Sequence, residues 1–306
     1  MSLIRRAVER VLFSGRAFDL FQRLGVHVTP NHFYSPVPDT RELERRAGLW
    51  ETDSEMPGVD LRADQQLETL RSVFARLRHE CDFPLDDTGV PHQYFIRNGA
   101  FGLTSAAVLH CMIRHLAPRT IVEVGSGNST YVSARAALMN GSDGKVTRLI
   151  AVEPYPSDTL RKGFPGLTRL LPRPAQEIGL PLFTDLQAGD ILFIDSSHVV
   201  RIGNDVLFLF LEVIPRLQKG VVIHVHDIFF PRPYPREWIV RRRRFWAEQY
   251  LLQALLVCNP CFEVLWCGSL MHLKHADALR AVFPPPQGLG AGQGYESSSF
   301  WMRKVG

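Results

Sequence analysis

The sequence TIVEVGSGNST, residues 120–130, decides the fold class. It begins as a short β-branched run, passes through a turn that holds two glycines, and continues into a helical pattern. Glycine lets a backbone turn tightly and approach a ligand where a Cβ atom would collide. The stretch therefore predicts a strand, a tight loop and a helix, with a ligand site at the loop.

Strand and helix patterns alternate on both sides of this stretch. Apolar strands that alternate with helices indicate a parallel sheet that is covered on both faces. The chain is thus expected to have an α/β fold. The spacing predicts helices over 103–116, 129–139, 206–217, 245–258 and 276–282, and strands over 120–124, 149–153, 167–171, 190–195, 221–227, 262–268 and 298–304.

The first 95 residues have a different pattern. Two helical patterns, over 3–24 and 60–80, flank the proline-rich segment TPNHFYSPVPDT at 29–40. Proline fixes φ and removes a hydrogen-bond donor, so this segment should be extended and irregular. We expect residues 1–95 to form an N-terminal helical cap that acts as a substrate lid, and residues 96–306 to form the ligand-binding domain.

Composition limits the function classes. The chain has 306 residues, of which 45% are hydrophobic and 22% charged, as in an ordinary globular protein. The net charge of +4 is too small to predict nucleic-acid binding by itself. No apolar run approaches the roughly 18–20 residues that a membrane span needs. Integral membrane insertion is therefore not expected.

Two further features concern location. The N-terminal pattern is a basic amphipathic helix, which either contacts a membrane surface peripherally or packs its apolar stripe on its own domain. The five cysteines are an odd number in a long chain, which is typical of reduced thiols. The cysteine content therefore predicts a cytoplasmic protein.

Four of the predicted strands end in polar residues, at the edge where open α/β sheets bind ligands. Glu123 lies two residues before the first glycine, where a carboxylate can meet the ammonium group of a ligand. Glu153 ends the next strand, a position typical of a carboxylate that accepts ribose hydroxyls. The dinucleotide fingerprint requires a third small residue where this chain has Thr130, which argues against an NAD-dependent oxidoreductase.

The segments EVGSGNST, AVEP, GDILFIDSSHV and HVHD together resemble the motifs of class I S-adenosylmethionine-dependent methyltransferases. The chain is similar to a bacterial subgroup that also carries NHFYSPVPDT, WAEQYLLQALL and a final SSFW. The resemblance covers about residues 25–303. It implies a Rossmann-like sheet of seven strands, of which six are parallel and the last is inserted antiparallel.

The resemblance also implies a role for each matching residue. Glu153 would bind the ribose hydroxyls of S-adenosylmethionine, Pro154 and Gln176 would lie near its adenine, and Asp195 would face the methyl donor or a metal. The residues that would hold the methionine moiety are Glu123, Gly125, Ser126, Gly127, Asn128 and Ser129.

Two catalytic hypotheses compete for Asp195, His198, His226 and Asp227. In one, His198 or His226 is a general base that takes a proton from a substrate hydroxyl, since histidine titrates near neutral pH. In the other, members of this set bind a divalent metal that lowers the pKa of the hydroxyl. A mixed Asp and His set suits Mn, Fe or Zn better than Mg. A structural role, in which the histidines bond backbone groups, is the third alternative.

The function that we expect is methyl transfer from S-adenosylmethionine to an oxygen of a small molecule or glycan. One alternative is a nucleic-acid methyltransferase, which requires Arg241–Arg244 to form a phosphate track. The other is a non-catalytic protein that binds S-adenosylmethionine. Arg236, Trp238 and the arginine run either bind an anionic acceptor or form a solvated face. No motif specifies an oligomeric state.

Overall fold

The computed structural model describes residues 3–290 and 297–306. The chain divides into two compact units. Met1–Thr52 and Pro235–Phe245 form one of them, called here the N-terminal unit. Asp53–Tyr234 and Trp246–Gly306 form the other, called the sheet unit.

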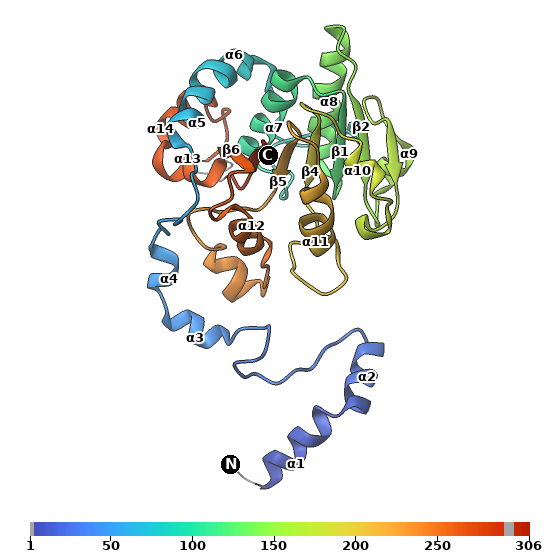
Figure 1. The fold of residues 1–306 in the computed structure, drawn as a ribbon, viewed down its shortest axis with the longest axis vertical. Helices are drawn as coiled ribbons and strands as arrows, with labels where there is room; N and C mark the ends of the chain where they lie inside the picture. The colour runs from blue at the N-terminus through green and yellow to red at the C-terminus, as the bar shows by residue number, and fades with distance from the viewer. Residues whose placement is uncertain (1–2, 291–296) are drawn as a thin grey trace. The chain divides into compact units, whose positions relative to one another are not determined.

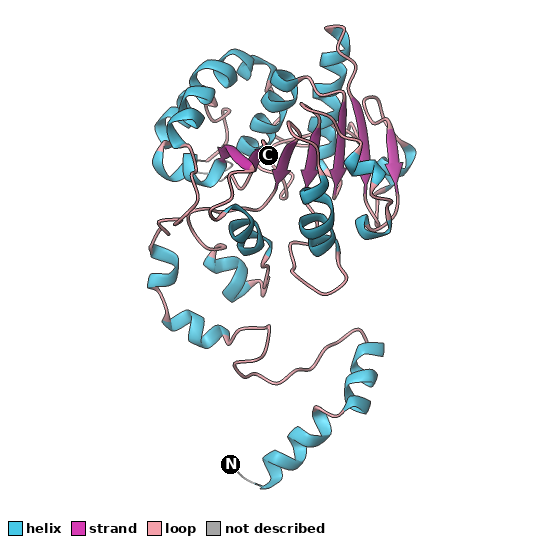
Figure 2. Cartoon of the chain, in the orientation of Figure 1, coloured by secondary structure: helices cyan, strands magenta, loops and turns pink. Residues whose placement is uncertain are grey.

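A seven-stranded sheet lies at the centre of the sheet unit (Figures 1 and 2). Its strand order is β3-β2-β1-β4-β5-β7-β6. Strand β7 runs antiparallel to both of its neighbours, whereas the other neighbouring pairs are parallel. The expected α/β fold with an inserted antiparallel last strand is thus confirmed. The strands are β1 (Thr120–Val124), β2 (Arg148–Val152), β3 (Arg169–Leu171), β4 (Ile191–Ile194), β5 (Val222–Val225), β6 (Phe262–Cys267) and β7 (Phe300–Lys304).

Each face of the sheet has its own apolar core, because successive side chains of a strand point to opposite faces. Ile121 and Phe193 belong to the core that includes helices α7 and α8. Val122 and Leu192 belong to the other core, which includes α12 and the helical segment from α11 to η5. The helices of both layers surround the strands in Figure 2.

The helical segments of the sheet unit agree with most of the predicted ranges. They are α5 (Ala63–Thr69), η1 (Leu70–Phe74), α6 (Ala75–Leu77), η2 (Arg78–Glu80), α7 (Leu103–Leu116), α8 (Asn128–Ser142), α9 (Asp158–Lys162), η3 (Ala175–Glu177), α10 (Pro181–Thr184), α11 (Asp205–Leu207), η4 (Phe208–Val213), η5 (Ile214–Arg216), α12 (Glu248–Leu256), α13 (Gly268–Lys274) and α14 (Ala276–Val282).

Residues 53–95 belong to the sheet unit, so the boundary that we expected near residue 95 lies instead at residue 52. The reason is the helical stretch 63–80, whose apolar face completes a core. Leu70 and Phe74 are fully buried. The ring of Phe74 lies 5.1 Å from that of Trp266 and 6.2 Å from that of Phe283. The stretch 63–80 is therefore part of the core of the sheet unit.

The N-terminal unit has little buried surface. Its helical segments are α1 (Leu3–Leu12), α2 (Gly15–Arg23), α3 (Thr40–Arg45), α4 (Gly48–Glu51) and η6 (Glu237–Arg241). None of the residues of α2, α3 and α4 is buried. The single helix expected over 3–24 is interrupted, since Ser14 caps α2 by accepting a hydrogen bond from the Ala17 amide at 3.3 Å. Across residues 3–290 and 297–306, no helix combines the length and the apolar character that a membrane crossing requires.

Candidate active site

The candidate site lies at the carboxyl ends of β1, β2, β4 and β5, where loops leave the parallel part of the sheet. The chain runs from β1 outward to β2 and β3 and then returns to β4 on the other side of β1, so the strand order reverses at β1. Such a reversal of strand order opens a crevice between neighbouring loops, and α/β proteins bind ligands there. The four polar strand ends that the sequence singles out all face this edge.

Gly125 brings the loop after β1 against the loop after β4. Its φ angle is +81°, and a Cβ atom there would lie 1.7 Å from the backbone oxygen of Asp195. No other residue type fits this position without moving one loop away from the other. Gly127 differs, because its φ of −174° is an ordinary extended value and an added Cβ would meet no atom within 4 Å.

Glu123 holds the start of α8 from below the loop. Its Oε1 accepts hydrogen bonds from the Ser129 hydroxyl at 2.6 Å and from the Thr130 hydroxyl at 2.8 Å, and the side chain is fully buried. Burial raises the pKa of Glu123 to about 7, although these hydroxyls act in the opposite direction. Its Oε2 is buried and has no hydrogen-bond partner within the described part of the chain. Glu123 lines neither of the cavities described below. Its hydrogen bonds therefore fix the glycine loop and the start of α8 from the buried side.

Glu153 is fixed by two backbone amides. Ser126 donates to Oε2 at 3.1 Å and Tyr155 donates to Oε1 at 2.8 Å. The carboxylate therefore ties the loop after β1 to the loop after β2. Its remaining lone pairs face a cavity on each side.

Two cavities flank Glu153, one of about 210 Å³ and one of about 360 Å³. Gly125, Glu153 and Asp195 line both of them. The smaller one adds the rest of the glycine loop, and the larger one adds residues that follow β2, β3 and β4. The predicted cofactor residues that line at least one cavity are Gly125, Ser126, Gly127, Asn128, Ser129, Glu153, Pro154, Gln176 and Asp195.

Asp195, His198 and Asp227 place three metal-ligating atoms within 4.8 Å of one another. The Nε2 atom of His198 lies 3.3 Å from Asp195 Oδ1 and 3.7 Å from Asp227 Oδ2. Asp227 also accepts a hydrogen bond from the Ser298 hydroxyl at 2.8 Å, which fixes the second carboxylate. In this structure the group is the one set of its kind among the described residues.

Two members of this group have left-handed backbone conformations. His198 has a φ of +59° and Asp227 a φ of +56°. A non-glycine residue in this region costs of order 1 kcal/mol, and such residues persist where the surrounding structure fixes them, often at functional sites. The two side chains are thus placed together at an energetic cost that their own local sequence does not explain.

Glu248, which the sequence analysis did not select, orients His198. The Nδ1 atom of His198 lies 2.8 Å from Glu248 Oε2, and Glu248 is fully buried. The amides of Ala247 and Glu248 donate to the His198 carbonyl at 3.0 and 3.2 Å. With Nδ1 facing Glu248, Nε2 faces Asp195 and Asp227. This is the arrangement by which a carboxylate fixes the tautomer of a metal-ligating histidine.

The carboxylates around His198 set its charge. Burial opposes the protonated form, but hydrogen bonds to Asp195 and Glu248 outweigh it, so the pKa of His198 is raised well above its usual value. Burial likewise opposes the charge of Asp195, yet the charge of His226 and the hydrogen bond of His198 lower the pKa of Asp195 to about 2. In the metal-free protein the carboxylates around His198 thus favour its protonated form.

His226 and His224 lie outside the group of three. His226 Nε2 is 3.6 Å from Asp227 Oδ1 and 3.4 Å from the Ser298 hydroxyl, so it contacts the group through Asp227. His224 is fully buried and stacks on Phe193 at 4.0 Å, as expected for a core histidine, and burial lowers its pKa well below the usual value. The compact group of three thus does not include His226.

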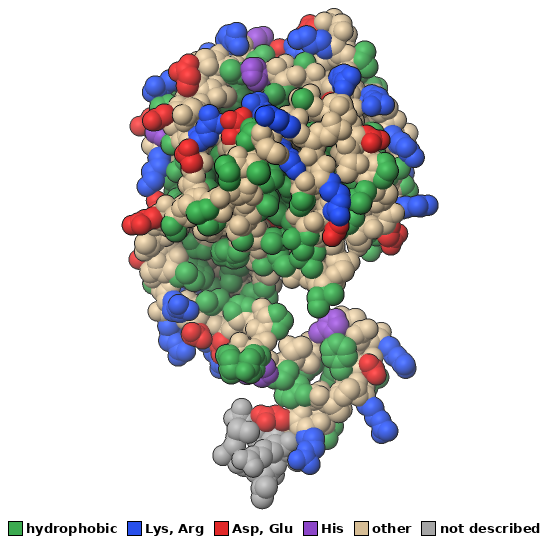
Figure 3. Space-filling view, in the orientation of Figure 1, with side chains coloured by type: hydrophobic (Ala, Val, Ile, Leu, Met, Phe, Trp, Pro, Cys, Tyr) green, Lys and Arg blue, Asp and Glu red, His purple; other side chains and the backbone are tan. Residues whose placement is uncertain are grey.

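The visible surface bears on the nucleic-acid alternative. In Figure 3 the Lys and Arg side chains of the sheet unit lie scattered among acidic and uncharged side chains. This face offers no continuous basic track of the kind that phosphate backbones require.

Comparison with known proteins agrees with the fold. Residues 122–228 match the family model described as a methyltransferase domain, a range that begins in β1 and ends just beyond β5. An uncharacterized protein of Archaeoglobus fulgidus is 31% identical over 192 residues, which are 61% of this chain and 85% of that protein. The chain belongs to the class I S-adenosylmethionine-dependent methyltransferases.

Solved structures with a similar fold have low sequence identity to the chain. An O-methyltransferase from Bacillus cereus in complex with S-adenosylhomocysteine is 15% identical and has a TM-score of 0.38, with 79% of this chain and 91% of that chain covered. A methyltransferase from Thermobifida fusca is 14% identical and has a TM-score of 0.40, with 85% and 98% covered. CmcI with Mg and S-adenosylmethionine is 18% identical and has a TM-score of 0.36, with 66% and 72% covered.

Proposed function

We propose that this methyltransferase transfers the methyl group of S-adenosylmethionine to a hydroxyl oxygen of a small molecule or glycan, at a divalent-metal site formed by Asp195, His198 and Asp227. One observation carries the proposal. The ligand atoms of these three residues lie within 4.8 Å of one another, and Asp195 also lines both cavities beside the glycine loop.

In this proposal S-adenosylmethionine occupies the two cavities that flank Glu153. The Glu153 carboxylate accepts the ribose hydroxyls, since the two amides that hold it leave lone pairs directed at the cavities. The methionine moiety lies along Gly125–Ser129 and the adenine lies near Pro154 and Gln176. The methyl group then lies toward Asp195, which both cavities share.

The donor set fits a divalent metal. Two carboxylates and one imidazole offer oxygen and nitrogen ligands, a mixture that suits Mn, Fe or Zn better than Mg. Glu248 holds His198 so that Nε2 faces the carboxylates, and Ser298 holds Asp227. A metal bound there would lower the pKa of the acceptor hydroxyl.

The protein's own contribution to the reaction is alignment. The acceptor O–H bond breaks, its oxygen bonds to the methyl carbon, and the sulfur keeps the electron pair of the broken C–S bond as S-adenosylhomocysteine leaves; the proton passes to solvent. The sulfonium is already a good leaving group, so holding oxygen, methyl and sulfur in line supplies most of the rate. Gly125 and Asp195 both line the two cavities, and their backbones are in contact. In this proposal their position determines where the methyl group meets the acceptor oxygen.

The test uses radiolabelled methyl transfer from S-adenosylmethionine into an extract of the native cell. Asp227→Asn is the informative variant, because asparagine tolerates the left-handed backbone of this position while it removes a charged ligand. Asp185→Asn is the matched control, since Asp185 is exposed and remote from the site. We expect chelation with EDTA and Asp227→Asn each to lower transfer by at least about tenfold.

Added metal should restore transfer in chelated wild type, and binding of S-adenosylhomocysteine should be unchanged in Asp227→Asn. If transfer survives EDTA but is lost in His226→Gln, a histidine base replaces the metal in the mechanism. If no labelled product forms although S-adenosylmethionine binds, the non-catalytic alternative holds.

A further inference from the structure

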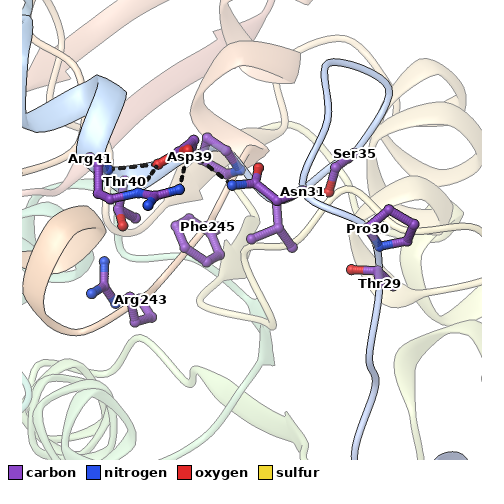
Figure 4. Close-up of a pocket in the computed structure, with 11 residues that line it drawn as sticks. Thr29, Pro30, Asn31, Ser35, Asp39, Thr40, Arg41, Arg243 and Phe245 are labelled. Atoms are coloured by element: carbon purple, nitrogen blue, oxygen red, sulfur yellow. Dashed lines mark hydrogen bonds and ion pairs between the residues drawn. The ribbon is translucent and has the colours of Figure 1, made fainter. Parts of the chain in front are cut away.

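The N-terminal unit contains a cavity of about 450 Å³ that shares no lining residue with the two cavities of the methyltransferase site (Figure 4). It joins the proline-rich segment to the end of the arginine run, about 200 residues later in the sequence. Its volume lies in the usual range of small-molecule sites, roughly 300–1,000 Å³. The lining residues are Thr29, Pro30, Asn31, Ser35, Val37, Pro38, Asp39, Thr40, Arg41, Arg243 and Phe245.

Arg243 supplies the uncompensated charge of this cavity. The neighbouring Arg242 lies 3.8 Å from Glu237, and the Arg244 guanidinium lies 5.0 Å from the centre of the Trp238 ring. Arg243 has no ion pair or side-chain hydrogen bond within the described residues, although it lies in the same run. Its φ of +59° is a left-handed value, which is unfavourable for arginine and turns the chain at the cavity wall.

The other charged pair on the wall is already satisfied. Asp39 lies 3.0 Å from the Arg41 guanidinium and accepts a hydrogen bond from Asn31 at 2.9 Å (Figure 4). The hydrogen bond from Arg41, followed by that from Asn31, holds the pKa of Asp39 far below its usual value. The Asp39 carboxylate is therefore occupied by Arg41 and Asn31 and does not offset the charge of Arg243.

The remaining lining residues are of two kinds. Phe245 lies in the middle of the lining residues in Figure 4 and offers an aromatic face, while Thr29, Ser35 and Thr40 offer hydroxyl groups. Arginine binds carboxylate and phosphate groups through paired hydrogen bonds. A ligand that matches all three features has one anionic group, several hydroxyls and a ring with an apolar face.

We propose that this cavity is a binding site for an anionic sugar, either a uronic acid or a sugar phosphate, with its anionic group on Arg243 and its ring against Phe245. The inference does not depend on the methyl-transfer proposal, because every residue in it belongs to the N-terminal unit.

The test is calorimetric titration of the full chain with glucuronate, glucose 6-phosphate and glucose, in the absence of S-adenosylmethionine. We expect one of the anionic sugars to bind, and glucose to bind at least about tenfold more weakly, because a hydrogen bond to a charged group is worth roughly 1.5–3 kcal/mol. The comparison of the two anionic sugars distinguishes a carboxylate site from a phosphate site.

Arg243→Gln should weaken binding of the anionic sugar by at least about tenfold. Arg241→Gln is the matched control, since it removes one charge from the same run but does not line the cavity, and it should change binding by less than about twofold. Phe245→Leu should weaken all three sugars together. Equal binding of glucose, equal effects of Arg243→Gln and Arg241→Gln, or no binding of either anionic sugar would each overturn the inference. Unchanged circular dichroism and thermal unfolding of the variants would show that they are folded.

Discussion

The strand ends of the sheet unit and the N-terminal unit hold their polar side chains in different ways. At the strand ends, Glu123 and Glu248 are fully buried and bonded to neighbouring side chains. In the N-terminal unit, helices α2, α3 and α4 have no buried residue, and the aromatic rings of Phe33 and Tyr34 are 86% and 78% exposed. Chemistry that requires fixed geometry is thus placed where a core fixes the backbone.

Left-handed backbone occurs in both units, but its surroundings differ. His198 and Asp227 lie beside buried strands and Glu248, whereas Arg243 lies in the N-terminal unit. In the N-terminal unit, prolines and short side-chain hydrogen bonds limit the chain instead, as in the group of Asn31, Asp39 and Arg41. Such a region has low local stability, which suits recognition better than catalysis.

The largest expected effect is on the free energy of unfolding, when a buried ring of the sheet unit and an exposed ring of the N-terminal unit are each removed. Phe74→Ala should lower the free energy of unfolding by about 3–5 kcal/mol, because it leaves a cavity beside Trp266 and Phe283. Phe33→Ala should change it by less than about 0.5 kcal/mol, because Phe33 is exposed. Urea denaturation measures both values. Similar losses in the two variants would mean that residues 53–95 do not belong to the core.

A second comparison uses two glycines with nearly equal φ angles. Gly125→Ala should cost about 3 kcal/mol or more and abolish binding of S-adenosylmethionine, because its Cβ would lie 1.7 Å from the backbone of Asp195. Gly25→Ala, at a φ of +75° and with no atom within 4 Å of the new Cβ, should cost only about 1 kcal/mol. Thermal unfolding separates the two. A mild Gly125→Ala variant would show that the two loops do not touch.

Glu123 should make the stability of the sheet unit depend on pH. Its pKa of about 7 in the folded chain lies above the ordinary 4.5. Between pH 4.5 and 7 the folded state therefore holds a proton on Glu123 that the unfolded state has lost. Stability is therefore highest below about pH 4.5 for this group and falls as the pH rises through 7, by on the order of 2–3 kcal/mol. Glu123→Gln should remove that slope. Parallel pH profiles of wild type and variant would contradict the assignment.

The smallest of these effects concerns a residue that the sequence analysis missed. Glu248→Ala should weaken binding of Mn²⁺ by about 10–100-fold, because His198 loses the carboxylate that orients it. Glu248→Gln should lose less, since its amide oxygen can still accept the Nδ1 proton. Titration of Mn²⁺ followed by electron paramagnetic resonance reads this directly. Equal affinities in wild type and both variants would remove Glu248 from the site.

The sequence predicts the sheet and the polar strand ends because strands buried on both faces are short apolar runs that stop at polar residues on the ligand edge. Glu248 is not found this way, since it lies 50 residues after His198 and only tertiary packing joins them. It does belong to the segment WAEQYLLQALL, which the resemblance to the bacterial subgroup includes. Residues 53–95 cluster with the sheet unit because the apolar face of 63–80 packs on its core. The cavity around Arg243 is formed by two segments that are remote in the sequence. The hydrophobic periodicity of the sequence does not indicate that they meet.

The most direct test of the central claim is calorimetric titration of S-adenosylmethionine and S-adenosylhomocysteine into wild type and Glu153→Ala. Glu153 bridges the two loops and lines both cavities, so its loss should weaken both ligands by at least about tenfold while the fold is kept. Glu177→Ala, at an exposed carboxylate beyond β3 that lines neither cavity, should bind like wild type. Absence of binding to the wild-type protein, or equal binding by wild type and Glu153→Ala, would contradict the placement of the methyl donor at these strand ends.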